Sequence, residues 1–128
     1  MTNKVRDTGV ASHIGFYSDA IEVEAGSRWL YTSGTPGIDG EGVFPDGIEA
    51  QTRLVWKNIF AALEAANMGP EDLVKVTTTL VDRRDVPTYV RVRKEVLGDI
   101  KPAFMLSVVD ELIKPNCLVE VEVIAAKK

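Results

Sequence analysis

In five segments of this chain, apolar residues either alternate with polar ones or run together. Successive side chains of a strand point to opposite faces, so segments of this kind are expected to form strands. Within residues 19–25, for example, the apolar Ile21 and Val23 alternate with glutamates. A Gly-Ser pair at 26–27 signals a turn, which predicts that the first two strands pair as a hairpin. The predicted strands are residues 19–25, 28–32, 74–80, 104–109 and 117–125.

In two other segments apolar residues recur every three to four positions, which is the period of a helix. The first of these segments is 48–66. Asp46 and Glu49 have the spacing of a capping box at its start, and Gly69 is placed to end it as a C-terminal glycine. The second segment is 85–98, and one of its faces carries Val86, Val90, Arg93 and Leu97.

The predicted order is strand–strand–helix–strand–helix–strand–strand. Two helices separated by a strand can cover the same face of one sheet when the crossover connections are right-handed. The predicted fold class is therefore α+β, a two-layer sandwich in which two helices cover one face of a single mixed sheet. The other face has no cover from its own chain, although Leu118 and Ile124 are expected on it. Such a face is best hidden against further copies, so we expect a homo-oligomer.

The composition is that of one globular domain over residues 1–128, with 45% hydrophobic and 27% charged residues. Fifteen Lys and Arg against nineteen Asp and Glu give a net charge of −4, and the pI is about 5.0. A charge of this sign argues against nucleic acid or an anionic membrane as a partner. No apolar run approaches the roughly 18 residues of a membrane span, and the first seven residues hold no apolar signal-peptide core.

Cysteine and histidine are too few for the chemistry that they usually support. Cys117 is the only cysteine, so no internal disulfide can form, which fits a reducing cytoplasm. Because His13 is the only histidine, a zinc site of the usual ligands and a Ser-His-Asp triad have little support. The glycine-rich segment 33–42 lacks the spacing of phosphate-binding loops. The sequence therefore predicts a soluble cytoplasmic protein without a bound metal.

Two glutamates are the first candidates for catalysis. Glu120 and Glu122 are two residues apart in the last predicted strand, so their carboxyl groups share one face at a spacing of about 7 Å. A carboxyl group on a face that another copy covers is suited to general acid–base catalysis. The alternative is that one or both carboxyl groups point to solvent or pair with a lysine.

Other residues are weaker candidates. Ser33 stands where a strand gives way to the glycine-rich segment, so its hydroxyl is expected near free backbone N–H groups. Tyr17 lies in a predicted loop, where packing is the alternative to chemistry. Cys117 is expected to be an inert core thiol. Arg93, on the apolar stripe of the second helix, is expected to form a surface ion pair; the alternative is an inward-facing clamp for an anion.

Short motifs follow one another along the chain in a characteristic order. They are Ile14-Gly15-Phe16-Tyr17, Tyr31-Thr32-Ser33-Gly34, Asn58-Ile59, Lys75-Val76-Thr77, Val81-Asp82, Lys101-Pro102-Ala103 and the stretch from Leu118 to Ala125. Together they resemble the Rid/YjgF family over essentially the whole chain. The resemblance implies a chorismate-mutase-like α+β fold and a homotrimer whose three sheets face inward as a barrel, with clefts between subunits. For the best-known branch it also implies hydrolysis of reactive enamines and imines to ketones and ammonia.

The resemblance also implies roles for individual residues. Tyr17 matches the family's cleft tyrosine, Ser33 the serine of its Thr-Ser-Gly segment, and Glu120 the glutamate that positions the attacking water. One position departs from the pattern. The deaminase branch has an arginine that grips the substrate carboxylate, and this chain has Phe104 there. A phenylalanine cannot form charge-assisted hydrogen bonds to a carboxylate.

We therefore expect an enzyme without a cofactor that hydrolyses a small imine or enamine between subunits, with less dependence on a substrate carboxylate. Ser33 and Gly34 would bind the polar end of the substrate, and Phe104 would form an apolar wall. Arg93 or Arg28 are the candidates to replace the missing arginine. The alternative is a non-catalytic small-molecule binder or holdase of the same fold, which the missing arginine favours. The endoribonuclease label of some members is disfavoured by the pI of about 5.0.

Overall fold

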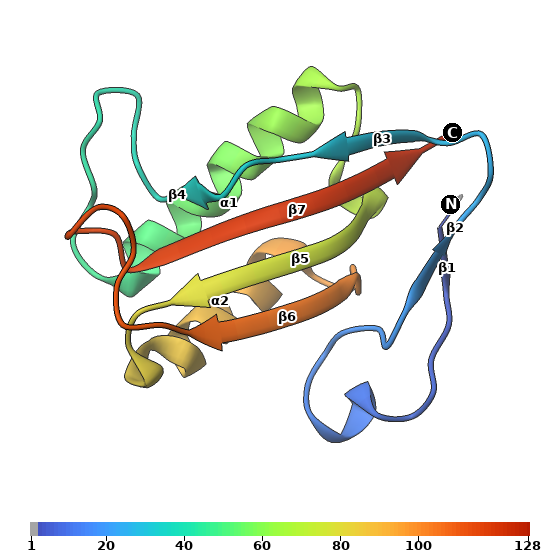
Figure 1. The fold of residues 1–128 in the computed structure, drawn as a ribbon, viewed down its shortest axis with the longest axis horizontal. Coiled ribbons are helices and arrows are strands. Elements are labelled where there is room, and N and C mark those ends of the chain that lie inside the picture. Colours follow the sequence, from blue (N-terminus) through green and yellow to red (C-terminus); the bar gives the residue numbers. More distant parts are fainter. Residues whose placement is uncertain (1–2) are drawn as a thin grey trace.

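The computed structural model describes residues 3–128, which form a main sheet, a small second sheet and two helices. The strand order of the main sheet is β3–β7–β5–β6, with β4 beside β7. Figure 1 looks onto the face of this sheet that no helix covers, and both helices lie behind it. The predicted α+β fold, with two helices on one face of a mixed sheet, is confirmed. The elements are β3 (Arg28–Tyr31), β4 (Thr35–Pro36), α1 (Ile48–Ala65), β5 (Leu73–Leu80), α2 (Val86–Leu97), β6 (Ala103–Val108) and β7 (Val119–Lys127).

The strand register decides which side chains face the helices. α2 links β5 to β6, which run parallel with Val76 opposite Phe104. β7 runs antiparallel to β5 on one side and to β3 and β4 on the other, so that Thr79 and Pro36 stand opposite Glu120. Alternate residues of a strand share a face. Val76 and Phe104 therefore lie on the helix side, whereas Glu120, between two buried valines, lies on the uncovered side.

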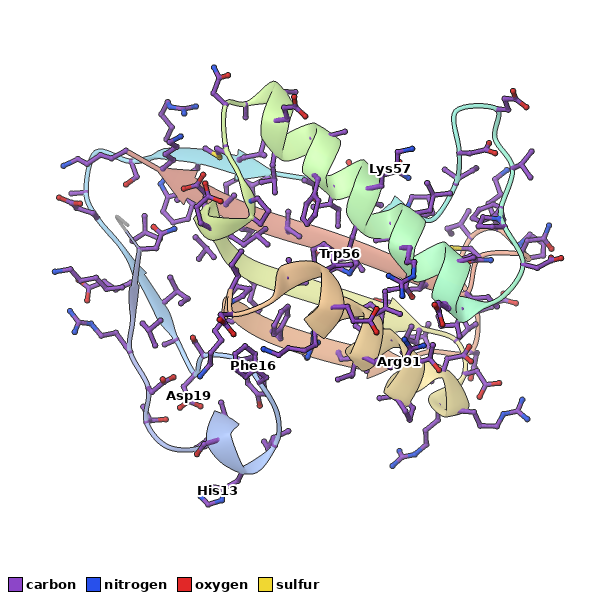
Figure 2. The ribbon with its side chains drawn as sticks, turned by 180° about the vertical axis from the view of Figure 1, so that it is seen from behind. His13, Phe16, Asp19, Trp56, Lys57 and Arg91 are labelled. Carbon is purple, nitrogen blue, oxygen red and sulfur yellow. The ribbon has the colours of Figure 1, made fainter. Side chains whose placement is uncertain are left out.

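Apolar side chains between the sheet and the helices form the core. The buried residues of α1 recur at helical spacing, so this segment buries one continuous stripe against the sheet. Trp56, labelled in Figure 2, is among them. One polar pair lies inside the core, where Thr78 Oγ1 and Tyr89 Oη are 2.5 Å apart and share a hydrogen bond. The largest fully buried side chains are Trp56, Tyr89, Ile59, Leu63 and Leu80.

The start of α1 differs from the prediction. Gly47, with a φ of 87°, precedes the helix, and no side chain caps the first turn. The carboxylate of Glu49 pairs with Arg53 and Arg91 instead. The predicted capping box of Asp46 and Glu49 is therefore wrong, because the helix begins one residue later than an Asp46 cap requires.

The end of α1 also differs from the prediction, which placed a helix-terminating glycine at Gly69. Asn67, rather than Gly69, adopts the left-handed conformation, with a φ of 56°. The N–H groups of Asn67 and Met68 donate to carbonyls of the last turn of α1, which is the Schellman arrangement. Gly69 is extended and precedes the short 3-10 turn η2 (Pro70–Asp72). The role given to Gly69 is therefore wrong.

The predicted hairpin between the first two strands does not form. β2 (Ile21–Val23) pairs antiparallel with β1 (Asn3–Val5), and β3 pairs with β7. The Asn3 amide donates to the carbonyls of Asp72 (3.3 Å) and Ala126 (3.1 Å), which fixes β1 against the end of the main sheet. Alternation identifies a strand but not its partner, and the polar N-terminal segment carries no apolar pattern that predicts β1.

The uncovered face of the main sheet is partly apolar. Trp29, Tyr31 and Met105 are 50%, 68% and 56% exposed on it, and Ile124 is half-buried. The placement of Ile124 on this face agrees with the prediction. Leu118 lies just before β7 rather than within it, and its N–H donates to the Gln51 side chain of α1 at 2.9 Å.

Two further 3-10 turns occur among the described residues, η1 (Ala11–His13) and η3 (Arg83–Asp85). Among residues 3–128, neither helix has the length and apolar character that a bilayer crossing needs. The prediction that the first seven residues hold no signal-peptide core includes residues 1–2, which lie outside the described residues.

Candidate functional site

The residues that the sequence predicts for the site lie in two groups on different parts of the sheet. Glu120, Ser33 and Gly34 meet where β7 passes the start of β4, on the face without helices. Tyr17 and Phe104 meet beside β6, next to α2.

The Glu120 carboxylate lies directly against Gly34. A Cβ added at Gly34 would contact Oε1 of Glu120 and lie 2.7 Å from its Cδ. The pairing of β4 with β7 explains this approach, because Pro36 stands opposite Glu120. Glu120 is half-buried, and its carboxylate takes part in none of the ion pairs formed among residues 3–128. Only a glycine at position 34 leaves room for this free carboxylate.

Ser33 lies at the surface next to this carboxylate. On one side of it, Thr32 Oγ1 accepts a hydrogen bond from the Val123 N–H at 2.9 Å. On the other side, Thr35 Oγ1 donates to the Ser33 carbonyl at 3.1 Å. These bonds fix the backbone around Ser33 and leave the residue itself exposed.

The segment after β4 is fastened to α1. The Asn58 side chain donates to the carbonyls of Pro36 (3.1 Å) and Ile38 (2.9 Å). Gly37 packs so closely that an added Cβ would lie 2.9 Å from Cα of Gln51. Asn58 belongs to one of the sequence motifs, but the motif alone does not predict these hydrogen bonds between α1 and the segment after β4.

Glu122 shares the uncovered face with Glu120, as the strand alternation predicts, but has different surroundings. It is exposed and stands opposite Thr77, within the main sheet rather than beside a loop. Its cross-strand neighbour Thr77 carries a hydroxyl, but Glu122 is not among the nearest atoms of any glycine in residues 3–128. Glu122 is therefore a natural control for Glu120.

The loop between β1 and β2 carries Tyr17, and Asp19 organises it. The Asp19 carboxylate accepts hydrogen bonds from the backbone N–H groups of Thr8 (2.7 Å), Gly9 (3.0 Å) and Ala11 (2.8 Å). These bonds, that from Thr8 above all, lower the pKa of Asp19. Figure 2 shows Asp19 in this loop, with its distal turn projecting away from the helices. Asp19 was not among the predicted site residues, although an aspartate beside a polar, glycine-containing stretch is a known signal of an ordered loop.

Ser18 ties this loop to the segment that enters β6. Its N–H donates to the Pro102 carbonyl at 3.1 Å, and its hydroxyl donates to the Lys101 carbonyl. The Tyr17 ring consequently meets the Phe104 ring edge to face, with centroids 6.3 Å apart and planes at 73°. The two residues predicted to line the cleft are thus in contact, and both are half-buried.

Arg93 of α2 lies against the same phenylalanine. Its guanidinium carbon is 3.9 Å from the ring centroid of Phe104 and 5.6 Å from that of Tyr89. Only 8% of the residue is exposed, so the expected surface ion pair is wrong. Arg28, the other arginine considered, donates to the Ala66 carbonyl at 3.2 Å, and it lies in the edge strand β3, on the opposite side of the sheet from β6.

A hollow of about 420 Å³ opens beside Tyr17, Arg93 and Phe104. A smaller hollow of about 140 Å³ adjoins it, and Arg93 and Phe104 line both. The larger hollow, mostly apolar with Arg93 as its charged residue, has a size typical of sites for small molecules.

The two groups are too far apart in one copy to hold one small substrate. Phe104 of β6 stands opposite Val76 of β5, and Glu120 of β7 stands opposite Thr79 of β5, so the two residues are two strand spacings and three residues apart. They also lie on opposite faces of the sheet. Spacings of about 4.8 Å between strands and about 3.3 Å per residue correspond to roughly 14 Å. A site that uses both groups must therefore take them from two copies of the chain.

Cys117 has the properties of a structural thiol. It is buried, its thiol donates to the Val119 carbonyl at 3.3 Å, and burial raises the pKa of the thiol. The described part of the chain contains no cluster of three His, Cys, Asp or Glu side chains that could hold a metal ion.

Comparison with known proteins adds to this geometry. The model of the endoribonuclease L-PSP family matches residues 9–127. A RutC family protein of Pyrococcus horikoshii is 42% identical over 118 residues, which cover 90% of each chain.

Solved structures share the fold. The Rid family protein YyfB of Yersinia pestis, described as a protein of unknown function, matches with a TM-score of 0.86 over 99% of this chain and 100% of its own. Its sequence identity is 24%, so that likeness concerns the fold alone. TdcF of E. coli, solved with bound serine, matches with a TM-score of 0.75 at 26% identity, over 97% of this chain and 94% of its own.

Proposed function

The chain belongs to the Rid/YjgF family, whose model is described as endoribonuclease L-PSP, and on this premise we propose that it is a hydrolytic deaminase of a small imine or enamine. Proteins of this family bind small molecules, and membership supports a deaminase or a related role. Residues 1–128 would form a single domain. The protein would be located in the cytoplasm, whose reducing conditions keep the thiol of Cys117 reduced.

The proposed reaction is the addition of water to the carbon of a protonated imine. Glu120 accepts a proton from the water as the new C–O bond forms. The protonated Glu120 then returns this proton to the nitrogen of the carbinolamine, the C–N bond breaks as the hydroxyl proton passes to water, and a ketone and ammonia leave. A protonated imine carbon is already electrophilic, so the reaction proceeds without a cofactor or metal.

The other predicted residues would complete the site between two subunits of a homotrimer. Ser33 and the backbone N–H groups near Gly34 would bind the polar end of the substrate, beside Glu120. Tyr17 and Phe104 of a neighbouring copy would form the apolar wall. The uncovered, partly apolar face of the main sheet supports this assembly, because such a face is stabilised when another copy covers it.

The observation that carries the proposal is the placement of Glu120. Its carboxylate is half-buried, unpaired, and held against a glycine next to an exposed serine. A carboxylate kept free of lysine and arginine in this way is available to accept a proton from water. The serine bound in TdcF of E. coli is a molecule of the size that such a site would take.

RNA cleavage, which the description of the family model names, has no support from the charges of this chain. The net charge is −4. On the helix surface the arginines Arg53 and Arg91 form a closed ring of ion pairs with Glu49 and Glu95, at 2.6 to 3.1 Å. Arg91 is labelled in Figure 2. Arginines neutralised in this way leave no basic stripe for a phosphate backbone along these two helices.

The test is the substitution Glu120→Gln, which keeps the shape of the side chain and removes the base. Imino acids generated in situ by an amino-acid oxidase serve as substrates, and the release of ammonia is measured against the uncatalysed rate. We expect Glu120→Gln to lower the rate by roughly 10²- to 10⁴-fold, the usual contribution of a general base.

Glu122→Gln is the matched control, since it removes the same charge from the same face one pleat further along. Its rate should stay within a few-fold of the wild type. The reverse order of effects would assign the base to Glu122. A wild-type protein that binds such compounds but does not accelerate their hydrolysis would favour the non-catalytic binder.

A further inference from the structure

Arg93 is a buried cation without a counter-ion. It is 8% exposed, and none of the ion pairs among residues 3–128 includes it. Arginine stays protonated in proteins, so a full positive charge lies between α2 and β6. A charge removed from water in this way is costly unless a partner compensates it. Stacking on Phe104 and Tyr89 compensates part of this cost, but neither residue is a carboxylate that could neutralise the charge.

The surroundings of Arg93 favour an anion. The residues that line the two hollows beside it include no aspartate or glutamate. A second cation, Lys94, lies at the rim, with its Nζ 3.5 Å from the ring centroid of Phe16, and Lys101 approaches the same ring to 5.0 Å. Figure 2 shows Phe16 close to the end of α2. Two cations, Arg93 and Lys94, therefore line the smaller hollow; Lys94 pairs with Asp99 at 3.6 Å, whereas Arg93 forms no ion pair among residues 3–128.

The balance of effects on Arg93 agrees with this picture. Burial lowers the pKa of its guanidinium from the ordinary value, and the neighbouring Tyr89 and Tyr17 act in the opposite direction. Neither tyrosine is a carboxylate, so Arg93 lacks the strongest kind of arginine partner among residues 3–128.

We propose that Arg93 binds the carboxylate group of an anionic small-molecule substrate in the hollow beside Tyr17 and Phe104. The guanidinium edge offers paired N–H donors that match the two oxygens of a carboxylate. Phe104 fixes the plane of the guanidinium by stacking, and Tyr17 bounds the hollow on the other side. The inference deepens the proposed function, on which it rests for the reaction, and reverses the sequence-based expectation of a substrate with little need for a carboxylate.

The probe for this inference is the pair pyruvate and pyruvamide, which differ in that a neutral amide replaces the carboxylate. Binding is measured by titration, with chemical shifts of the Arg93 Nε–H group followed by NMR. The wild type should bind pyruvate roughly 10- to 100-fold more tightly than pyruvamide, which is the usual range for hydrogen bonds to a charged group. The Arg93 Nε–H signal should move on addition of pyruvate only.

Two substitutions on the same helix separate the clamp from a general charge effect. Arg93→Gln should abolish the preference for pyruvate over pyruvamide. Arg91→Gln removes the same charge two residues away, where the guanidinium is exposed and paired with Glu49 and Glu95, and should leave the preference unchanged. Arg93→Lys should retain part of the preference, because it keeps the charge but loses the paired donors.

Equal wild-type binding of pyruvate and pyruvamide would overturn the inference, whatever the folding of any variant. It would also be overturned if the Arg93 signal did not respond to pyruvate, since the arginine would then be a structural cation stacked on Phe104. These measurements need no turnover. If Glu120→Gln abolishes ammonia release while Arg93 shows no carboxylate preference, the inference fails and the proposed function stands. If Arg93 binds pyruvate but no imine is hydrolysed, the proposed function fails and the anion site stands.

Discussion

At the scale of single residues, the position of the Glu120 carboxylate depends on the absence of a side chain at Gly34. Gly34 needs no left-handed backbone, but the Glu120 carboxylate occupies the space where any other residue would place its Cβ. The strand alternation predicts that Glu120 lies on the uncovered face. It does not predict this contact, which arises from the pairing of β4 with β7, two segments that are about 85 residues apart in the printed sequence.

The contact leads to a prediction for Gly34→Ala. The added methyl group must displace the flexible end of Glu120, so the carboxylate moves while the strands stay paired. We expect kcat/KM for ammonia release to fall roughly 10- to 100-fold, because displacements of about 1 Å in a catalytic group have effects of this size.

Gly40→Ala is the control, since an added Cβ at Gly40 meets nothing within 4 Å. It should leave both kcat/KM and the midpoint of thermal unfolding unchanged. If Gly34→Ala is as active as the wild type, the Glu120 carboxylate does not need its observed position.

Arg93 shows the limit of sequence patterns for single residues. It stands on the apolar stripe of a helix, where most arginines extend to the surface. Its burial is decided by Phe104, whose ring comes from a strand beside the helix and takes the stacking position. The pattern gave two alternatives for Arg93, and only the packing of α2 on β6 distinguishes them.

At the scale of elements, the loop between β1 and β2 holds Tyr17 through one aspartate. We predict that Asp19→Ala loosens this loop and raises KM about tenfold by displacing Tyr17, with a smaller effect on kcat. Asp19→Asn keeps one acceptor oxygen and should lie between the alanine variant and the wild type. The kinetic constants are measured together with hydrogen exchange of the Thr8 and Ala11 amides.

The pH dependence of this loop follows from the sign of the pKa shift. The pKa of Asp19 in the folded protein lies below the ordinary value of 3.8. Its stabilising effect is therefore fully present above that value and is lost as the pH falls through the lower, folded pKa. Protection of the two amides should be constant from pH 7 to about pH 5 and decrease below about pH 4. Unchanged protection in Asp19→Ala would show that other contacts hold the loop.

The bounds of helices and strands could be predicted from the sequence where a regular pattern of buried apolar residues defines them. β5, α2 and β6 lie within one residue of the predicted segments, because each of them buries apolar residues in one core. The ends of α1 were predicted less well. A capping box and a terminal glycine are local signals, and here Gly47 and Asn67 take those places while Glu49 is drawn to the arginines of its own helix and α2.

At the scale of the whole molecule, the main sheet leaves one face without cover from its own chain. The sequence predicted this open face from the order of the elements, and the structure confirms it. Its most exposed apolar residues, Trp29, Tyr31 and Met105, could not be recognised beforehand, because a strand pattern does not tell which face is covered until the partners are known. The same lack of partner information explains the wrong hairpin between β2 and β3.

The central claim is that two copies of the chain contribute to one site, Glu120 from one copy and Tyr17 with Phe104 from its neighbour. It is tested most directly by mixing two inactive variants, Glu120→Gln and Tyr17→Ala, through co-expression with different tags. In a randomly mixed trimer about one quarter of the sites combine an intact Glu120 with an intact Tyr17.

The co-purified mixture should therefore recover about one quarter of the wild-type rate of ammonia release, although each variant alone is nearly inactive. Light scattering should give three times 14.0 kDa for the mixture and for both variants, which checks that assembly is intact. A trimeric mixture no more active than the better single variant, or a monomeric wild type, would contradict the account.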